Sequence, residues 1–187
     1  MSIRRGEIIA RLKATLDRER FEHSLRVEQV AQSLGKKWKV SRALLSPAAL
    51  LHDCARRFGR PQLLKEAKKL CIMIDPVSRL EPKLLHAEIG ARLAQKEFGI
   101  KSAAVLSAIR RHTIGAEKMS RLDKIIYLAD HIEEGRDFGE VAKIRKLAYQ
   151  DLDRAIALST SNMIAFLLEQ GLPIHAGTVA TRNYYIK

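Results

Sequence analysis

Apolar residues recur at helical spacing along almost the whole chain, and this pattern constrains the fold more than any other feature. Spacings of three and four residues run through segments such as 25–34, 102–112 and 152–168, as in helices that bury one face. Alternating patterns typical of strands are nearly absent, and the best candidate, residues 125–128, sits inside a better helical pattern. The sequence therefore predicts an all-α fold, a bundle of about eight to ten helices.

Capping and breaking residues divide this pattern into segments. Ser41 precedes an apolar periodic segment, as a helix N-cap does, whereas Gly35 is expected to loosen the end of the helix before it. No repeat, low-complexity tract or convincing linker interrupts the chain. We expect a single domain over residues 1–187, with a motif core at about 20–137 and C-terminal helices at 139–187 packing on it.

The charge balance is strongly basic, with 34 Lys+Arg against 21 Asp+Glu and a formal net charge of +13. Such a chain favours anionic partners, among them nucleic acid, phosphorylated small molecules and acidic membrane faces. More than half of the excess lies between residues 35 and 70. This segment, with Trp38, is a candidate nucleic-acid contact; a solvated helix end with Trp38 tucked under it is the favoured interpretation.

Neither a membrane span nor a disulfide framework is expected. No apolar run approaches the roughly 18 residues that a membrane helix needs, and the basic N-terminus lacks the apolar stretch of a secretory signal. The two cysteines, Cys54 and Cys71, lack CxxC spacing. We therefore expect a cytoplasmic protein with no membrane partner.

Four histidines and two aspartates stand out because they adjoin apolar residues. His52 and Asp53 directly follow an apolar run, and Asp130 follows another; a carboxylate there is unfavourable unless it is paired or coordinated. Taken alone, each histidine is better explained as a core or surface residue. Together, imidazole and carboxylate without thiolate are the ligand set of Fe, Mn, Co or Zn sites rather than structural zinc. The six candidates are His23, His52, Asp53, His86, His112 and Asp130.

These residues carry a resemblance to a known family. In the order His23, then His52 and Asp53, then Asp130, the chain resembles the HD superfamily of metal-dependent phosphohydrolases, which are all-α domains. The segments HSLRV, LLHDCARR, LLHAEIGA, AIRRHTIG, SRLDKIIYLADHIEEGR and PIHAGTVATRNY look like those of the symmetrical bis(5'-nucleosyl)-tetraphosphatases. The resemblance covers about residues 20–184, which is most of the chain.

The resemblance implies a site for two divalent transition-metal ions, iron in the first place and Mn, Co or Zn as alternatives. Asp53 would bridge the ions and hold a hydroxide nucleophile between them. The implied ligands are, for one ion, His23, His52, Asp53 and Asp130 and, for the other, Asp53, His86 and His112. The implied reaction is the hydrolysis of diadenosine tetraphosphate to two ADP.

Polar side chains near the implied ligands are candidates for holding phosphates outside the metals. A solvated surface charge explains any single basic residue among them equally well. The candidate substrate contacts are Arg26, Arg56, Arg110, Thr113, Lys124 and Arg136. The chain also departs from the family pattern, since HIEEGR stands where relatives commonly read YIEPGR, and His131 and His175 are left without a role.

Other interpretations stay open at the level of the sequence. The same site fits another nucleotide, such as a mononucleotide, a nucleoside triphosphate or a cyclic dinucleotide, because metals act on the phosphoryl group and say little about the base. A different class is a non-catalytic, basic helical module that binds nucleic acid through residues 35–70. The oligomeric state, monomer or homodimer, is equally open.

Overall fold

The structure, a computed structural model, describes residues 3–186, so the first two residues and the last residue of the expected domain lie outside it. Its described part consists of α-helices and two 3-10 helices, with no strand, which confirms the all-α prediction. The α-helices are α1 (Arg5–Thr15), α2 (Arg18–Trp38), α3 (Arg42–Leu51), α4 (Arg60–Lys69), α5 (Pro76–Leu80), α6 (His86–Lys96), α7 (Ala103–Arg111), α8 (Arg121–Ile132), α9 (Val141–Ala148), α10 (Leu152–Glu169) and α11 (Ala176–Tyr185). The 3-10 helices are η1 (Cys54–Arg57) and η2 (Pro82–Leu85).

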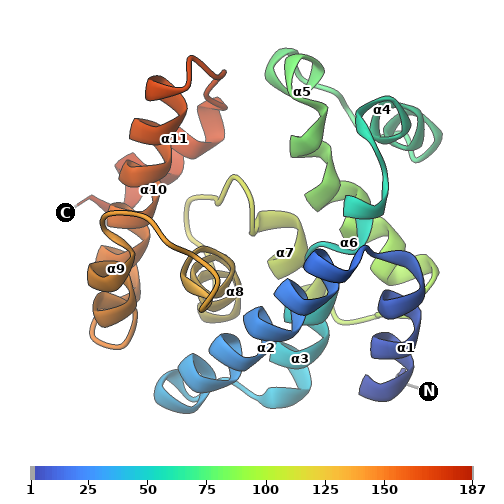
Figure 1. The fold of residues 1–187 in the computed structure, drawn as a ribbon, viewed down its shortest axis with the longest axis horizontal. Helices are drawn as coiled ribbons and strands as arrows, with labels where there is room; N and C mark the ends of the chain where they lie inside the picture. The colour runs from blue at the N-terminus through green and yellow to red at the C-terminus, as the bar shows by residue number, and fades with distance from the viewer. Residues whose placement is uncertain (1–2, 187) are drawn as a thin grey trace.

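The core gathers around α8, which packs against α2, α3, α7, α9 and α10. Figure 1 shows α10 and α11 on one side of α8, and α4 and α5 on the far side of the molecule. Tyr127 and Ile126 of α8 are fully buried, as are Leu34 of α2 and Leu50 of α3. Among the described helices, none combines the length and apolarity needed to cross a membrane.

The junction of α2 and α3 differs from the sequence prediction in an instructive way. Helix α2 continues through Gly35 and ends only at Lys39, which has φ 55°. A Cβ atom on Gly35 would lie 2.1 Å from Leu45 Cδ1, so glycine permits the close packing of α3 rather than ending α2. The Ser41 hydroxyl accepts a hydrogen bond from the Ala43 N–H at 3.2 Å, and this confirms the predicted N-cap of α3.

Helix α10 changes character along its length. Its buried residues all lie in the first half, between Leu152 and Thr160. Residues 161–169 are all half-buried or exposed, although they include Met163 and Phe166. The second half of α10, residues 161–169, therefore lies outside the packed core, and its side chains form a wall that core residues do not cover.

Candidate metal centre

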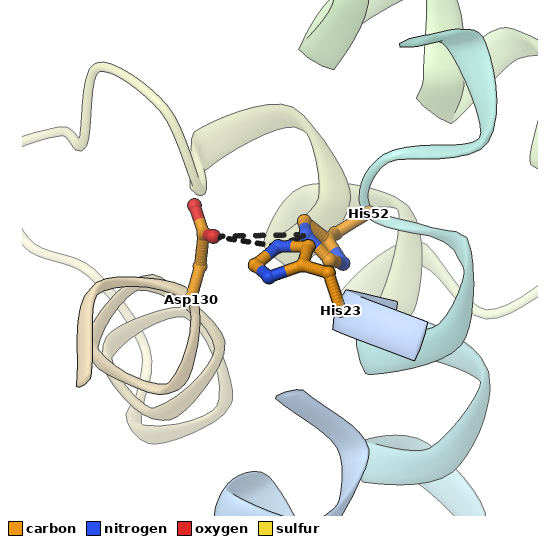
Figure 2. A group of neighbouring side chains, drawn as sticks. All are labelled: His23, His52 and Asp130. Atoms are coloured by element: carbon orange, nitrogen blue, oxygen red, sulfur yellow. Dashed lines mark hydrogen bonds and ion pairs between the residues drawn. The ribbon is translucent and has the colours of Figure 1, made fainter. Parts of the chain in front are cut away.

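His23, His52 and Asp130 come from three helices and point toward one another (Figure 2). His23 lies in α2, His52 caps the end of α3, and Asp130 lies in the last turn of α8. The two histidine Nε2 atoms are 3.2 Å apart. Asp130 Oδ1 lies 3.1 Å from Nε2 of His23 and 3.8 Å from Nε2 of His52. These three residues form the first cluster, whose donor atoms are close enough to share one metal ion.

Asp53 joins the first cluster to a second one, formed with His86 and His112. Asp53 Oδ2 lies 3.8 Å from Nε2 of His52 and 4.0 Å from Nε2 of His23. Asp53 Oδ1 lies 3.2 Å from Nε2 of His86 and 3.6 Å from Nε2 of His112. The Nε2 atoms of His86 and His112 are 2.9 Å apart. One buried carboxylate thus faces a pair of imidazoles with each of its oxygens, as the bridging role implied by the resemblance requires.

The tautomers of the histidines show that the donor set fits a cation. The Nδ1–H groups of His52, His86 and His112 donate to main-chain carbonyl groups three residues earlier, at 2.7 Å for His52 and 2.6 Å for His112. On the far side of His23, Nδ1 lies 3.2 Å from Glu133 Oε1. With Nδ1 committed as a donor, a neutral imidazole presents a lone pair at Nε2. Lone pairs that face each other at about 3 Å repel unless a cation lies among them.

Burial and charge keep most of these donors deprotonated. Burial is the largest effect on His52 and lowers its pKa to about 4, and it lowers the pKa of His86 as well. Burial by itself would raise the pKa of Asp53 and of Asp130. The neighbouring histidines outweigh this effect and hold both pKa values well below the ordinary range. For His112, burial is the largest single effect and lowers the pKa, but the hydrogen bond with Asp53 and the charges of Asp130 and Asp53 together outweigh it, so the pKa is raised. Ionised carboxylates and neutral imidazoles are the forms that bind metals.

Glu133 is a buried carboxylate that the sequence analysis missed. Its side chain accepts hydrogen bonds from Arg26 Nε and from the Gly135 N–H, the latter at 2.7 Å, and its Oε1 faces His23 Nδ1. A carboxylate on the outer nitrogen of a histidine fixes the orientation and tautomer of the ring. The signal that could have found it is its position three residues after Asp130, one turn further along the chain.

A cleft of about 780 Å³ opens over the two clusters, within the range usual for small-molecule sites. Three of the six predicted substrate contacts line it: Arg56, Thr113 and Arg136. Arg136 Nη2 donates to Asp130 Oδ1 at 2.8 Å, and Thr113 Oγ1 lies 3.1 Å from His86 Nε2. These side chains therefore stand directly beside the clusters.

The other three predicted substrate contacts do not line the cleft, and each forms an ion pair with a carboxylate. Their partners are Glu133 for Arg26, Glu88 for Arg110 and Asp153 for Lys124. These ion pairs connect neighbouring elements of the fold. Contact of the three residues with a substrate stays a prediction.

Two cations that the sequence analysis did not single out, Arg20 and Lys83, do line the cleft. Arg20 Nη1 donates to Asp53 Oδ2 at 3.2 Å. Both residues stand three positions before a clustered histidine, His23 or His86. Residues three apart share one face of a helical turn, so a basic residue at that spacing was the available signal.

Trp38 and Cys54 have structural partners. The indole N–H of Trp38 donates to the Ala148 carbonyl at 2.8 Å, and the half-buried ring packs against the core. This agrees with the interpretation of a tryptophan tucked under a helix end. Burial raises the pKa of Cys54 to about 12, so the thiol does not form a nucleophilic thiolate at neutral pH.

The fold and the site define an all-α protein whose histidine–aspartate clusters suit divalent metals. The model of the HD domain family matches residues 20–135, which include all six clustered residues. The chain belongs to the HD-domain family.

Several bacterial relatives carry the name "Bis(5'-nucleosyl)-tetraphosphatase, symmetrical". The protein from Halalkalibacterium halodurans is 37% identical over 96% of this chain and 95% of its own length. The protein from Bacillus subtilis is 34% identical over 97% of each chain. A crystal structure from Clostridium acetobutylicum, of a protein described as a predicted HD superfamily hydrolase involved in NAD metabolism, superposes with a TM-score of 0.94 at 34% identity, covering 99% of this chain and 98% of that one. These similarities confirm the resemblance inferred from the motifs.

Proposed function

We propose that this protein is a metal-dependent hydrolase that cleaves diadenosine tetraphosphate symmetrically into two molecules of ADP. The names of the relatives support this substrate. The observation that carries the proposal is the position of Asp53, whose two carboxylate oxygens face two separate pairs of histidines at the base of one cleft. Such an arrangement suits paired cations acting on one phosphoryl group.

The ligands proposed for two divalent transition-metal ions are the six clustered residues, with Asp53 shared. Iron is the first choice for the metal, and Mn, Co or Zn suit the same donors. When bound, such ions would supply Lewis-acid activation of a phosphoryl group and of water. We further propose a cytoplasmic enzyme of one domain that acts as a monomer or a homodimer.

The basic side chains of the cleft hold the phosphates of the substrate. Arg20, Arg56, Lys83 and Arg136 place four cationic groups along its lining. Arg20 and Arg136 are oriented in advance by their hydrogen bonds to cluster carboxylates, so little side-chain freedom is lost when a phosphate binds. They neutralise the polyphosphate chain and align it over the clusters.

Metal analysis combined with chromatography of the products tests this function. Purified protein should contain about two transition-metal ions per chain and should convert diadenosine tetraphosphate to ADP alone. Release of ATP and AMP would contradict symmetrical cleavage. Turnover of a mononucleotide, a nucleoside triphosphate or a cyclic dinucleotide, with none of the dinucleoside tetraphosphate, would replace the substrate but keep the site.

A further inference from the structure

The cleft over the clusters has a second part that is apolar. It is lined from the second half of α10 and from the loops that follow α8 and α10: Phe138, Met163, Phe166, Leu167, Leu172 and Pro173. Phe166 is 52% exposed and Leu172 is 42% exposed, so these side chains leave apolar area free for a ligand. Apolar surface gathered inside a cleft is a mark of ligand binding.

One face of α10 is turned toward the cleft. Ser159, Met163 and Phe166 follow one another at spacings of four and three residues, which places them on one side of the helix, and all three line the cleft. Leu168 belongs to the same apolar stretch but does not line the cleft, and it is 65% exposed. Phe166 therefore lies in the cleft, and Leu168 is an exposed apolar residue of the same helix outside it, which makes it a suitable control.

Polar groups lie at the buried end of this apolar wall. Ser159 is 2% exposed, and its hydroxyl is near enough to that of Tyr127 to act on the pKa of the tyrosine. Within residues 3–186, neither hydroxyl forms a hydrogen bond of ordinary geometry. Asn162 also lines the cleft, and its Nδ2 donates to the Leu158 carbonyl at 3.1 Å, which leaves Oδ1 as an acceptor. A buried hydroxyl without a good partner is unfavourable unless a ligand completes it.

His131 adds an acceptor from α8. Its ring stacks on Tyr127 with centroids 4.5 Å apart, and its Nδ1–H donates to the Tyr127 carbonyl at 2.8 Å. The ring is therefore held in the tautomer that presents Nε2 as an acceptor. His131 follows Asp130 in the chain and lines the same cleft as the apolar side chains, so a ligand bound over the clusters can reach it.

We propose that this part of the cleft is a nucleobase subsite that selects a base with an exocyclic amino group, adenine in the first place. The apolar wall packs against the face of the base. His131 Nε2 and Asn162 Oδ1 accept from the amino group, and the Ser159 hydroxyl pairs with a ring nitrogen. Hypoxanthine presents a carbonyl oxygen to the same acceptors and is rejected. The inference rests on the proposed function only in placing the phosphates over the clusters.

Calorimetric titration of the metal-loaded protein with ADP, inosine diphosphate and pyrophosphate tests the subsite. Wild-type protein should bind ADP most tightly, because only ADP offers both a base and an amino group. Phe166→Ala should weaken ADP binding about tenfold and leave pyrophosphate binding unchanged, while the control Leu168→Ala should change neither. Ser159→Ala should reduce the preference for ADP over inosine diphosphate. Equal affinity for ADP and pyrophosphate in the wild type, or equal losses in both alanine variants, would overturn the inference.

Kinetics separate this inference from the proposed function. If the wild type turns over diadenosine tetraphosphate, Phe166→Ala should raise KM with little change in kcat, and an unchanged KM would refute the subsite alone. If the wild type does not hydrolyse that substrate but still binds ADP in preference to inosine diphosphate and pyrophosphate, the proposed function fails and the subsite stands. Phe166 is half-exposed, so the variant is expected to fold.

Discussion

The two ends of the cleft are built in opposite ways. At the clusters, His52 is completely buried, and the outer nitrogen of each histidine is tied to an oxygen acceptor. Along α10, beyond Thr160, no side chain is buried, and Phe166 stands half in solvent. The comparison indicates that the fixed geometry needed for metal binding is built inside the packed core. Recognition of the nucleotide instead uses apolar side chains that are not packed into the core.

Removal of the carboxylate that the two clusters share should have the strongest effect on the metal end of the cleft. Asp53→Ala leaves both histidine pairs without their common ligand, so metal content should fall to near zero and hydrolysis by at least about 1,000-fold. Asp137→Ala is the matched control, because Asp137 is an exposed acid that lines the same cleft outside the clusters. Elemental analysis and product chromatography on both variants measure the effect. Retention of two ions by Asp53→Ala would contradict the bridged arrangement.

The packed core and the second half of α10 should also differ in how much they contribute to folding stability. Leu34→Ala removes a fully buried side chain of α2 and should lower the free energy of unfolding by about 2–5 kcal/mol. Phe166→Ala removes a larger side chain from the wall and should lower it by less than about 0.5 kcal/mol. Urea denaturation of the two variants gives both values. Similar losses would show that the wall belongs to the core after all.

A smaller effect is expected at the support of the first cluster. Glu133→Gln weakens the hold on His23 and Arg26, and metal affinity should fall about 10–100-fold, as for other carboxylates behind metal-binding histidines. Glu134→Gln, at the adjacent exposed position, should leave it unchanged. Competition with a chelator measures affinity apart from turnover. Equal affinity in the two variants would remove the positioning role of Glu133.

The smallest effect concerns a polar group within the core itself. Glu28 is buried in α2, where Arg5 and Ser46 donate hydrogen bonds to its carboxylate. Burial by itself would raise the pKa of Glu28, but these hydrogen bonds and the charge of Arg5 outweigh it, so the pKa lies below its ordinary value of 4.5. A lowered folded-state pKa stabilises the protein above the unfolded-state pKa, and this stabilisation is lost as the pH falls through the folded-state value.

Glu28→Gln should therefore destabilise the protein by about 1 kcal/mol at neutral pH, with a difference that shrinks below about pH 4.5. Thermal unfolding of both proteins between about pH 3 and 7 measures it. The exposed pair of Arg18 with Glu22 provides the control, since Glu22→Gln should change the pH dependence far less. A difference that grows toward acid would contradict the assigned direction.

The sequence allowed prediction of the clusters better than of the surrounding contacts. A carboxylate such as Asp53 next to apolar residues is a local anomaly, visible without knowing the fold. Arg26, Arg110 and Lys124 look alike in sequence, but their partners lie 107, 22 and 29 residues away. Which carboxylate a basic residue reaches depends on helix packing, so half of the predicted substrate contacts lie outside the cleft.

Helix types were likewise easier to predict than helix ends. The period of apolar residues predicted a helix over residues 152–168, where α10 lies. The role predicted for Gly35 was wrong because a glycine can either end a helix or allow a neighbouring element to pack closely. The contact with Leu45, which only the folded structure shows, identifies the second role. The second half of α10 has the composition of a core helix, so its position on the cleft could not be foreseen from the pattern.

The overhang of α10 has an evolutionary consequence. Because residues 161–169 contribute no fully buried side chain, substitutions there are expected to meet weaker selection for stability than substitutions in the core. Descendants of such a protein can exchange one preferred nucleotide for another through substitutions in this segment, while the histidines and aspartates of the same cleft are inherited unchanged.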